Sequence, residues 1–305
     1  MSDLNKIAIL ILNYNSCSLT ISNVNQLLKL NENLNIVIVD NCSTDNSYIE
    51  FINIYKRNNN IRILKNTNNN GYAAGNNFGL KYIKENLRDV EYAVIMNPDI
   101  FVSTIDVFLN LLEALQKNKD ISVISGSIIF NHEWRAFLDF GWKLPSYKTL
   151  CFSGTLIGKL LNIPVNELYS NCLISNNLIK VDVVPGCFFM TKISDLEKVG
   201  WFDESTFLYY EETILAKKLQ RIGKGEAILL DNLVYHNHEI KDKNVKNIKH
   251  RIFDRRCFHN SKMVYIRGYS GMNHFQLTVC IFINKLDFYI KQMVFRLQNL
   301  KRVDR

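Results

Sequence analysis

The N-terminal part of the chain alternates short apolar runs with segments whose apolar residues recur at helical spacing. Apolar runs at residues 7–12, 36–39, 61–64 and 92–96 predict strands, and those without a charged residue are typical of strands buried on both faces. The residues expected on the buried faces of the first two intervening helices are Leu19, Val24, Leu27, Leu28, Ile49, Ile52 and Tyr55. A third helix is expected over about residues 73–86. This βαβαβαβ order predicts one parallel sheet with right-handed crossovers.

Three of these strands end in polar side chains. Asn13 follows the first strand, Asp40 ends the second, and Asn97-Pro98-Asp99 stops the run at residues 92–96. Because Pro98 cannot donate a ladder hydrogen bond, Asp99 is expected just beyond the carboxyl end of its strand. The carboxyl ends of parallel strands meet at one edge of the sheet, where open α/β sheets bind ligands. Asn-Pro-Asp is also good turn chemistry, so this motif alone leaves both interpretations open.

The second part of the chain is less regular. Strands are expected at residues 122–130, 181–184, 187–191 and 226–230, and helices at residues 108–116, 195–199 and 211–222. The last helix opens with Glu211-Glu212, although two carboxylates in a first helical turn can serve only the helix macrodipole. Tyr235-His236-Asn237-His238 follows after a short loop, and both rings would face one side only if the segment is extended.

Residues 131–180 have no clear period. Their aromatic side chains stand among Gly and Pro; they are Trp134, Phe137, Phe140, Trp142 and Tyr147. We expect an irregular insertion that either lines an acceptor site or simply covers the sheet.

The composition is that of a globular protein in a reducing compartment. The chain has 305 residues, 47% of them hydrophobic, which is enough for a sizeable core. Its seven cysteines form no close pair and no ligand-like spacing, so neither a disulfide framework nor a zinc site is indicated. The run at residues 7–12 is too short for a signal peptide, and no run reaches the roughly 18 residues of a membrane span. A cytoplasmic location is therefore expected.

The net charge of +8 is concentrated at the C-terminus, because residues 251–305 hold eleven Lys and Arg against three Asp. Apolar residues recur near helical spacing there, at Leu277, Cys280, Ile281, Leu286, Ile290, Met293, Leu297 and Leu300. A basic amphipathic helix can lie on the inner face of the cell membrane. The same stripe can instead pack on the rest of the chain or on another subunit of a homo-oligomer, and both alternatives stay open. The segment has no recognisable motif for reading a nucleic acid, so no nucleic-acid partner is expected.

Six motifs in order resemble the family 2 glycosyltransferases, and the bacterial members closest in pattern are rhamnosyltransferase-like enzymes of surface polysaccharide synthesis. The resemblance covers about residues 6–240. Its motifs are Val39-Asp40-Asn41-x-Ser43-x-Asp45-x-Ser47, Asn70-Gly71-Tyr72-Ala73-Ala74-Gly75-Asn76-Asn77-x-Gly79, Asn97-Pro98-Asp99, Pro185-Gly186, Gly200-Trp201-Phe202-Asp203-Glu204 and Phe207-Leu208-Tyr209-x-Glu211-Glu212.

The resemblance implies an α/β fold of the GT-A type. Residues 1–105 would form the nucleotide-sugar-binding half, residues 106–240 the acceptor-binding half of the same domain, and residues 241–305 a basic helical extension. The implied activity is inverting transfer from a dTDP- or UDP-sugar to a glycan or a lipid-linked acceptor.

On the donor side, the resemblance implies that Asp40 accepts a hydrogen bond from the pyrimidine base, with Asn13 near the same base. Asn41, Gly75, Asn76 and Asn97 would complete the donor site, with small residues where the backbone approaches the nucleotide.

Asp99 matches the metal-binding carboxylate of the family's Asp-x-Asp motif, which would hold Mg²⁺ or Mn²⁺ on the diphosphate. Asn97 replaces the first Asp of that motif. His236 falls where some relatives place a histidine that helps bind the metal or the diphosphate.

Glu211-Glu212 stands where the family has Glu-Asp, so Glu212 is the expected general base and Glu211 the alternative. Glu212 is one methylene longer than Asp, and Ile214 stands where the family often has another acid.

Two other functions compete with this one. A non-catalytic nucleotide-sugar-binding subunit would explain Asn97 and Glu212. A sugar-phosphate nucleotidyltransferase would need a Gly-rich basic loop after the first strand, and Asn13-Tyr14-Asn15-Ser16 contains no Gly.

Overall fold

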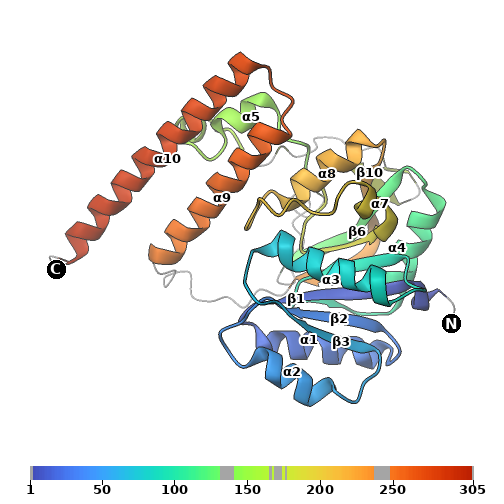
Figure 1. Cartoon of the computed structure of the whole chain (residues 1–305). Helices are drawn as coiled ribbons and strands as arrows, with labels where there is room; N and C mark the ends of the chain where they lie inside the picture. The colour runs from blue at the N-terminus through green and yellow to red at the C-terminus, as the bar shows by residue number, and fades with distance from the viewer. Residues whose placement is uncertain are drawn as a thin grey trace.

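The computed structural model describes residues 3–130, 141–164, 167, 174–175, 177–236 and 248–303, and its N-terminal part alternates strands with helices (Figure 1). After a 3₁₀ turn at Leu4–Lys6, the elements are β1 (Ile7–Asn13), α1 (Cys17–Leu30), β2 (Asn35–Asp40), α2 (Ser47–Tyr55), β3 (Ile61–Lys65), α3 (Tyr72–Asn86) and β4 (Tyr92–Met96). The four strands are parallel in the order β3-β2-β1-β4, which confirms the predicted topology. Asn13 lies directly opposite Asp40.

The second part of the chain extends the same sheet. Its elements are β5 (Ile100–Val102), α4 (Asp106–Lys117), β6 (Ile121–Phe130), α5 (Tyr147–Phe152), α6 (Leu156–Leu160), β7 (Ile174–Ser175), β8 (Leu178–Val181), β9 (Phe188–Lys192), α7 (Ile193–Lys198), α8 (Glu211–Arg221) and β10 (Gly225–His236). The described strands follow the order β3-β2-β1-β4-β9-β6-β10-β8-β7, and β5 pairs with β10. Because β9 runs antiparallel to β4, the residues before β9 reach the edge where β4 ends.

Helices cover both faces of the sheet, as the apolar strands predict. In β1, Ile7, Ile9 and Ile11 pack with α1, α2 and α4, whereas Ala8 and Leu10 pack on the other face with α3, α7 and α8. This alternation follows from the two-residue period of a strand. Each fully buried Ile or Leu of this kind stabilises the fold by about 1.5–3 kcal/mol.

The predicted buried face of α2 is wrong for Ile49 and Ile52 and confirmed for Tyr55. Ile49 and Ile52 are 59% and 36% exposed, whereas Phe51 and Tyr55 are buried. Ser47, Phe51 and Tyr55 are four residues apart and share one face of the helix, and this face meets the sheet. The large aromatic rings therefore fill the space that the isoleucines were expected to fill.

The last strand is longer than expected. The sequence predicts a strand at residues 226–230 and a loop before Tyr235, but β10 continues to His236. A register shift between Leu229 and Leu233 interrupts its pairing with β6, which explains why the pattern breaks there. His238 and the aromatic residues Trp134, Phe137 and Phe140 lie outside the described residues; Trp142 bridges to Val183, and Tyr147 opens α5.

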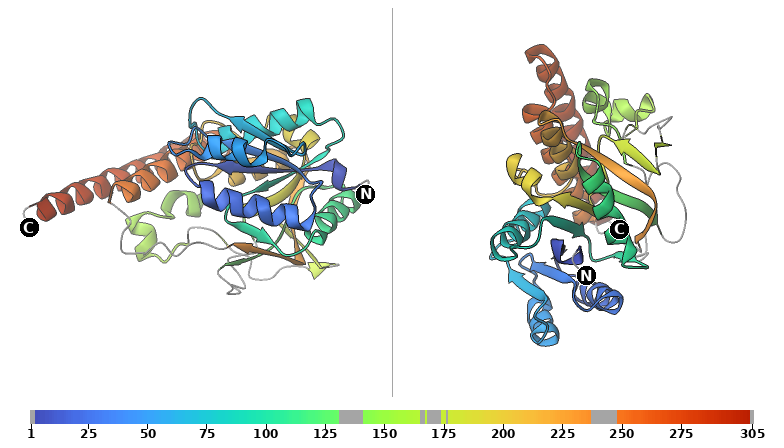
Figure 2. Two further views of the ribbon diagram at one scale, coloured as in Figure 1. Left: turned by 90° about the horizontal axis from the view of Figure 1, so that it is seen from below. Right: turned by 90° about the vertical axis from the view of Figure 1, so that its right-hand side faces the viewer.

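The basic C-terminal segment is helical, as predicted, and consists of α9 (Ile248–Gly268) and α10 (His274–Val303). Cys280 and Ile266 join Leu150 and Ile214 in an apolar cluster that fastens α9 and α10 to α5 and α8. The C-terminal end of α10 extends away from the sheet (Figure 2). In the part of the chain that the structure describes, no helix is long and apolar enough to cross a membrane.

Candidate active site

The ends of β1 and β2 form a buried polar cluster. Asn13 Nδ2 donates to Asp40 Oδ1 at 3.0 Å and to Ser43 Oγ at 3.1 Å, and the Ser43 amide donates to Asp40 Oδ2 at 3.2 Å. Thr20 Oγ1 in turn donates to Asn13 Oδ1 at 2.8 Å. Asn13 and Asp40 are both buried, so these bonds satisfy polar groups that would otherwise be costly to desolvate. The expected convergence of the two strand ends is confirmed, and the contact of Asp40 with a base stays a prediction.

Asn41 fastens the loop between β3 and α3 to this cluster. Its Nδ2 donates to Asn69 Oδ1 at 3.0 Å and to the Gly71 carbonyl at 3.2 Å, and its Oδ1 accepts from Asn66 Nδ2 at 2.9 Å. The side-chain amide of Asn41 therefore has its hydrogen-bond partners within the protein, where it orders the loop that leads into α3.

The glycines of this loop are needed for packing within the protein. Gly71 has φ +95°, and a Cβ there would lie 2.2 Å from the Phe207 carbonyl oxygen. A Cβ at Gly75 would lie 2.6 Å from Leu12 Cδ1. Close approach to the loop before α8 and to the sheet therefore already excludes a side chain at these positions. The approach of a nucleotide, which the family resemblance implies, stays a prediction.

Asn76 retains hydrogen-bonding capacity. Its Nδ2 donates to the Tyr72 carbonyl at 3.0 Å, while its buried Oδ1 has no hydrogen-bond partner among the described residues. A buried amide oxygen without a partner usually has a specific reason. This is the observation of the structure that fits the predicted donor-binding role of Asn76.

The two predicted metal ligands lie next to each other. Asp99 precedes β5, which pairs with the end of β10 so that Ile100 lies opposite His236. His236 Nε2 is 2.9 Å from Asp99 Oδ2, and the Phe130 ring packs on the imidazole at a centroid distance of 4.7 Å. The backbone N–H of Asn97, two residues before Asp99, donates to the Cys187 carbonyl at 2.9 Å. The contact between Asp99 and His236 arises because β5 pairs with β10, a pairing that the sequence did not predict.

This pair fits a divalent cation that takes its other ligands from substrate. A carboxylate oxygen suits Mg²⁺ and Mn²⁺, and an imidazole suits Mn²⁺ better than Mg²⁺. Among the described residues, no group of three or more His, Cys, Asp or Glu side chains is placed to hold a metal. Asp99 and His236 would therefore bind the ion together with phosphate oxygens or water.

Glu211 and Glu212 begin α8 in an environment that favours the neutral carboxyl group. Burial, and then the charge of Glu212, raise the pKa of Glu211 to about 8. Burial also raises the pKa of Glu212. Glu211 Oε1 has no hydrogen-bond partner among the described residues, and a Cβ at Gly186 would lie 3.7 Å from Glu212 Oε2. Glu212 thus lies beside Gly186, and Glu211 has a carboxyl oxygen available for a hydrogen bond.

The loop before α8 is held in a strained shape. Tyr209 and Tyr210 have φ values of 74° and 69°, a conformation uncommon for residues other than glycine. The Tyr72 amide donates to the Phe207 carbonyl at 2.8 Å, and the Tyr72 hydroxyl donates to the Gly186 carbonyl at 2.6 Å. Tyr72 therefore links the start of α3 to the loop before α8 and to the segment before β9.

Two supporting residues escaped the sequence-based prediction. Asn77 exchanges hydrogen bonds of 3.0 Å with the backbone of Phe202, which joins α3 to the segment before α8. Glu226 is buried and accepts the Val184 amide at 2.7 Å, and burial raises its pKa well above the usual range. Asn77 stands inside a recognised motif, but Glu226 opens an ordinary strand, and only the tertiary structure brings it near Glu212.

The fold is that of GT-A glycosyltransferases, as comparison with solved structures shows. GalNAc-T7 with UDP, GalNAc and Mn²⁺ superimposes with a TM-score of 0.58 at 12% identity, over 79% of this chain and 45% of that one. The mannosyltransferase PcManGT from Pyrobaculum calidifontis, solved with GDP-Man and Mn²⁺, gives 0.56 at 14% identity, over 93% and 72% of the two chains. TarS of S. aureus gives 0.53 at 13% identity, over 90% and 69%. The TM-scores establish the shared fold.

The chain belongs to glycosyl transferase family 2, whose model matches residues 8–171. The low-salt glycan biosynthesis hexosyltransferase Agl10 of Haloferax volcanii is 27% identical over 256 residues, which are 82% of this chain and 69% of the relative. The rhamnosyltransferase WbbL of Escherichia coli is 27% identical over 156 residues, 50% of this chain and only 55% of the relative. The predicted family and fold are confirmed, and the protein is a glycosyltransferase.

Proposed function

We propose that this protein is an inverting glycosyltransferase that moves a sugar from a dTDP- or UDP-sugar to a glycan or lipid-linked acceptor in surface polysaccharide synthesis. The observation that carries the proposal is the placement of two kinds of chemistry at one end of the sheet. The Asp99–His236 pair can hold a cation, and the Glu211–Glu212 pair can take a proton. The solved relatives carry UDP or GDP-Man, which supports a nucleotide-diphospho-sugar as the donor.

On the donor side, Asp40 and Asn13 orient the base, while Asn41, Gly75 and Asn76 shape the loop beside the nucleotide. Asp99 and His236 would hold Mg²⁺ or Mn²⁺, and Asn97 supports the turn that carries Asp99. The cation, when bound, supplies charge neutralisation for the leaving diphosphate.

On the acceptor side, Glu212 is the general base and Glu211 is the alternative. An inverting displacement needs one carboxylate within hydrogen-bond reach of the acceptor hydroxyl, on the side of the sugar opposite the diphosphate. A raised pKa makes a carboxylate a stronger base, provided that it is ionised at the working pH. Burial raises the pKa of Glu212, and burial together with the charge of Glu212 raises the pKa of Glu211.

The direct test is a screen of nucleotide-sugars for hydrolysis of the donor to nucleoside diphosphate, with Mn²⁺, with Mg²⁺ and with excess EDTA. We expect one donor to be turned over, and EDTA to stop the reaction. Binding of a donor without any turnover, also in the presence of acceptor extracts, would instead identify a non-catalytic nucleotide-sugar-binding subunit. Full activity in EDTA would refute the metal site at Asp99 and His236, and would leave the proposed role of Glu211 and Glu212 intact.

We also propose that the protein works in the cytoplasm and contacts the inner face of the cell membrane through residues 251–305. Part of the expected apolar stripe is used inside the protein, because Leu277, Cys280 and Ile281 pack against α5, α8 and α9. Another face of α10 remains exposed and apolar, with Phe275, Phe282, Leu286, Tyr289 and Met293. Basic residues beside an exposed apolar face suit an anionic lipid surface.

A further inference from the structure

A cavity of about 520 Å³ lies between α9, α10 and the turn that joins α5 to α6. Its size is within the range of small-molecule sites in proteins. The only residue of the loop before α8 that lines it is Tyr209, two residues before Glu211. The donor-side residues Asp40 and Asp99 do not line it.

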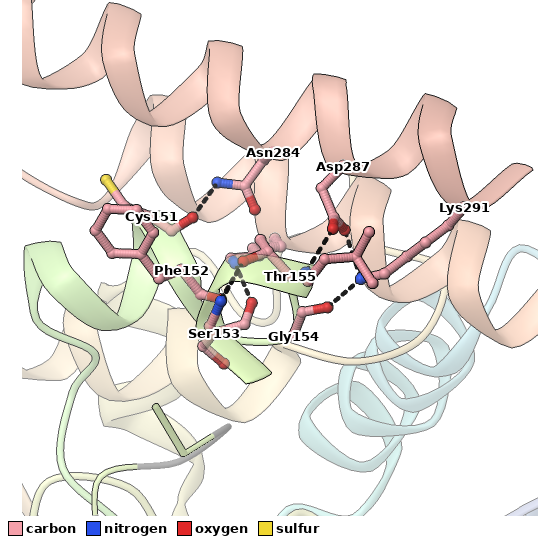
Figure 3. Close-up of polar contacts among 11 residues, drawn as sticks. Cys151, Phe152, Ser153, Gly154, Thr155, Asn284, Asp287 and Lys291 are labelled. Atoms are coloured by element: carbon pink, nitrogen blue, oxygen red, sulfur yellow. Dashed lines mark hydrogen bonds and ion pairs between the residues drawn. The ribbon is translucent and has the colours of Figure 1, made fainter. Parts of the chain in front are cut away.

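The wall of this cavity is built by specific polar contacts, which Figure 3 shows. Asn284 Nδ2 donates to the Cys151 carbonyl at 3.4 Å, as Figure 3 shows, and to the Leu150 carbonyl at 3.0 Å. Asp287 Oδ1 accepts the Leu156 amide at 2.7 Å. Lys291 donates to the Gly154 carbonyl and lies 2.5 Å from Asp287 Oδ2. Three α10 side chains one turn apart thus hold the turn between α5 and α6 against the helix, so the cavity is a formed feature of the fold.

The cavity is strongly cationic. Five lysine and arginine side chains line it against two aspartates; the cations are Lys159, Arg255, Arg256, Lys262 and Lys291. His259 also lines it, but burial lowers the pKa of His259 to about 4, so this ring is neutral at pH 7. It stacks on Phe288 at a centroid distance of 4.2 Å.

Two kinds of cation in the cavity have capacity for a ligand. Lys262 is 2% exposed, and its Nζ donates at 2.8 Å to the Ser153 carbonyl, which uses one of its three protons. Burial lowers the pKa of Lys262 to about 8, which measures how poorly its charge is solvated. Arg256 and Lys159 are exposed, and neither side chain makes a hydrogen bond or ion pair to any residue within the described ranges.

The cavity lies against the loop that carries the proposed base. The Phe258 ring on α9 packs edge-on against Tyr209 and Tyr210, at centroid distances of 5.8 and 5.6 Å. Ser261 Oγ donates to the Leu208 carbonyl at 2.9 Å. A molecule in the cavity therefore lies beside the loop that leads into Glu211 and Glu212.

Apolar surface adjoins the cationic residues. Ile252, Phe258 and Phe288 line the cavity itself. Next to Thr155 and Lys159, helix α6 exposes Leu156, Ile157 and Leu160, the last of them 83% exposed. Cations beside exposed aliphatic side chains match an amphiphile with an anionic head and an apolar chain.

We propose that this cavity binds the phosphate or diphosphate group of the acceptor, which places a phosphate-linked sugar before Glu211 and Glu212. The inference rests on the proposed function, because it assigns the acceptor of the same transfer reaction. Arginine and lysine form their strongest hydrogen bonds with such oxyanions. Binding of the anion also satisfies the remaining protons of Lys262.

Calorimetric titration of the full-length protein with farnesyl diphosphate, pyrophosphate and farnesol tests the assignment. EDTA is present in all titrations, so that a diphosphate does not bind through a metal at Asp99. We expect farnesyl diphosphate to bind, and Arg256→Ala and Lys159→Ala each to weaken binding by about tenfold, the usual effect of one charged hydrogen bond. Arg251→Ala is the matched control, because Arg251 is an exposed arginine of α9 that does not line the cavity.

The three probes separate the sources of the anion. Tighter binding of farnesyl diphosphate than of pyrophosphate supports a lipid-linked acceptor, and equal binding supports a soluble phosphorylated acceptor. Equal binding of farnesol, or unchanged affinity in the Arg256→Ala/Lys159→Ala double variant, overturns the proposal.

A parallel assay keeps this inference separate from the proposed function. The double variant should still hydrolyse the donor in the presence of Mn²⁺, since neither residue belongs to the donor site. If the protein hydrolyses a donor but binds neither farnesyl diphosphate nor pyrophosphate, the proposed phosphate site in the cavity is wrong and the proposed glycosyltransferase activity stands. The opposite result is that the wild-type protein binds a diphosphate, the double variant does not, and no donor is bound or hydrolysed. The proposed function is then wrong, and the cavity remains a phosphate-binding site.

Discussion

Asp99, with its carboxylate 2.9 Å from His236 Nε2, is the residue on which cation binding depends most directly. Asp99→Ala should abolish the Mn²⁺-dependent part of nucleotide affinity and reduce transfer by roughly two orders of magnitude or more, because charge neutralisation by a metal is worth several kcal/mol. Calorimetric titration with UDP, with and without Mn²⁺, measures the first effect independently of turnover. Asp89→Ala, at an exposed aspartate outside the site, is the control. Wild-type nucleotide affinity and Mn²⁺ dependence in Asp99→Ala would refute the assignment.

Glu212 and Glu211 compete for the role of base. Glu212→Gln should leave donor affinity nearly unchanged and reduce transfer by about 10²–10⁴-fold, since an amide cannot take the hydroxyl proton. If Glu211→Gln has this effect and Glu212→Gln does not, the role of base moves to Glu211.

The same pair predicts the dependence of activity on pH. A base acts when ionised, and burial raises the pKa of Glu212, so kcat/KM should still be rising with pH above about 6. If Glu211 is the base, the rise should extend to about pH 8, because the pKa of Glu211 is raised to about 8. Rates at saturating Mn²⁺ over this range provide the measurement. A profile that is flat from pH 5 upward would show that the base titrates at an ordinary carboxyl pKa.

Asp40 combines a predicted ligand contact with an observed structural role. Asp40→Ala removes the acceptor for Asn13 and Ser43, and it should raise donor KM by the equivalent of about 1–3 kcal/mol. Donor KM and Tm are measured together. A lower Tm with an unchanged KM for every donor would show that Asp40 does not contact the donor and only stabilises the ends of β1 and β2.

At the scale of elements, α10 divides its apolar residues between two partners. One face packs on α5, α8 and α9, whereas Phe282 and Tyr289 belong to the exposed face. The double variant Phe282→Ser/Tyr289→Ser should therefore keep the fold and lose affinity for anionic vesicles. Co-sedimentation with phosphatidylserine vesicles, compared with phosphatidylcholine vesicles and repeated at high salt, measures this.

The matched control for that experiment is Ile49→Ser, at an exposed isoleucine of α2. If the wild-type protein stays in the supernatant with both kinds of vesicle, the membrane contact is wrong. A wild-type dimer that dissociates in the Phe282→Ser/Tyr289→Ser variant would assign the exposed face to a homo-oligomer.

At the scale of the whole molecule, the buried carboxyl groups set a pH dependence of stability. Glu211, Glu212 and Glu226 have raised pKa values, so the folded state binds more protons than the unfolded state between about pH 4.3 and the raised pKa. Stability should therefore fall as pH rises, and Glu211 alone accounts for a fall of about 1–2 kcal/mol between pH 6.5 and 8, to which Glu212 and Glu226 add. The lowered pKa values of His259 and Lys262 act in the opposite direction, that of His259 below about pH 6.5 and that of Lys262 from about pH 8 upward.

Thermal unfolding at pH 6.5 and at pH 8 measures this effect. Glu226→Gln should flatten the dependence, because its amide can still accept from Val184 and no longer titrates. A Tm that rises over this interval would contradict the raised pKa values.

The sequence by itself determined the parallel half of the sheet and the residues at its carboxyl edge. Uninterrupted apolar runs bury both faces of a strand, and parallel strands must end at one edge, so Asn13, Asp40 and Asn97 converge whatever the remaining packing. Helix α2 marks the limit of such reasoning. Its buried face is chosen by shape, and Phe51 fills the space better than Ile49 or Ile52.

Only the tertiary structure decided the contacts between segments distant in sequence. The pairing of β5 with β10 brings His236 to Asp99, the burial of α8 raises the pKa of Glu211, and the packing of α9 and α10 on α5 encloses the cationic cavity. None of these three features can be predicted from the residues near it in the sequence. Each depends on which distant segments pack around a side chain, and on the water and charges that remain there. Periodicity reports only which face of an element is apolar, whereas the chemistry of a site depends on what that face meets.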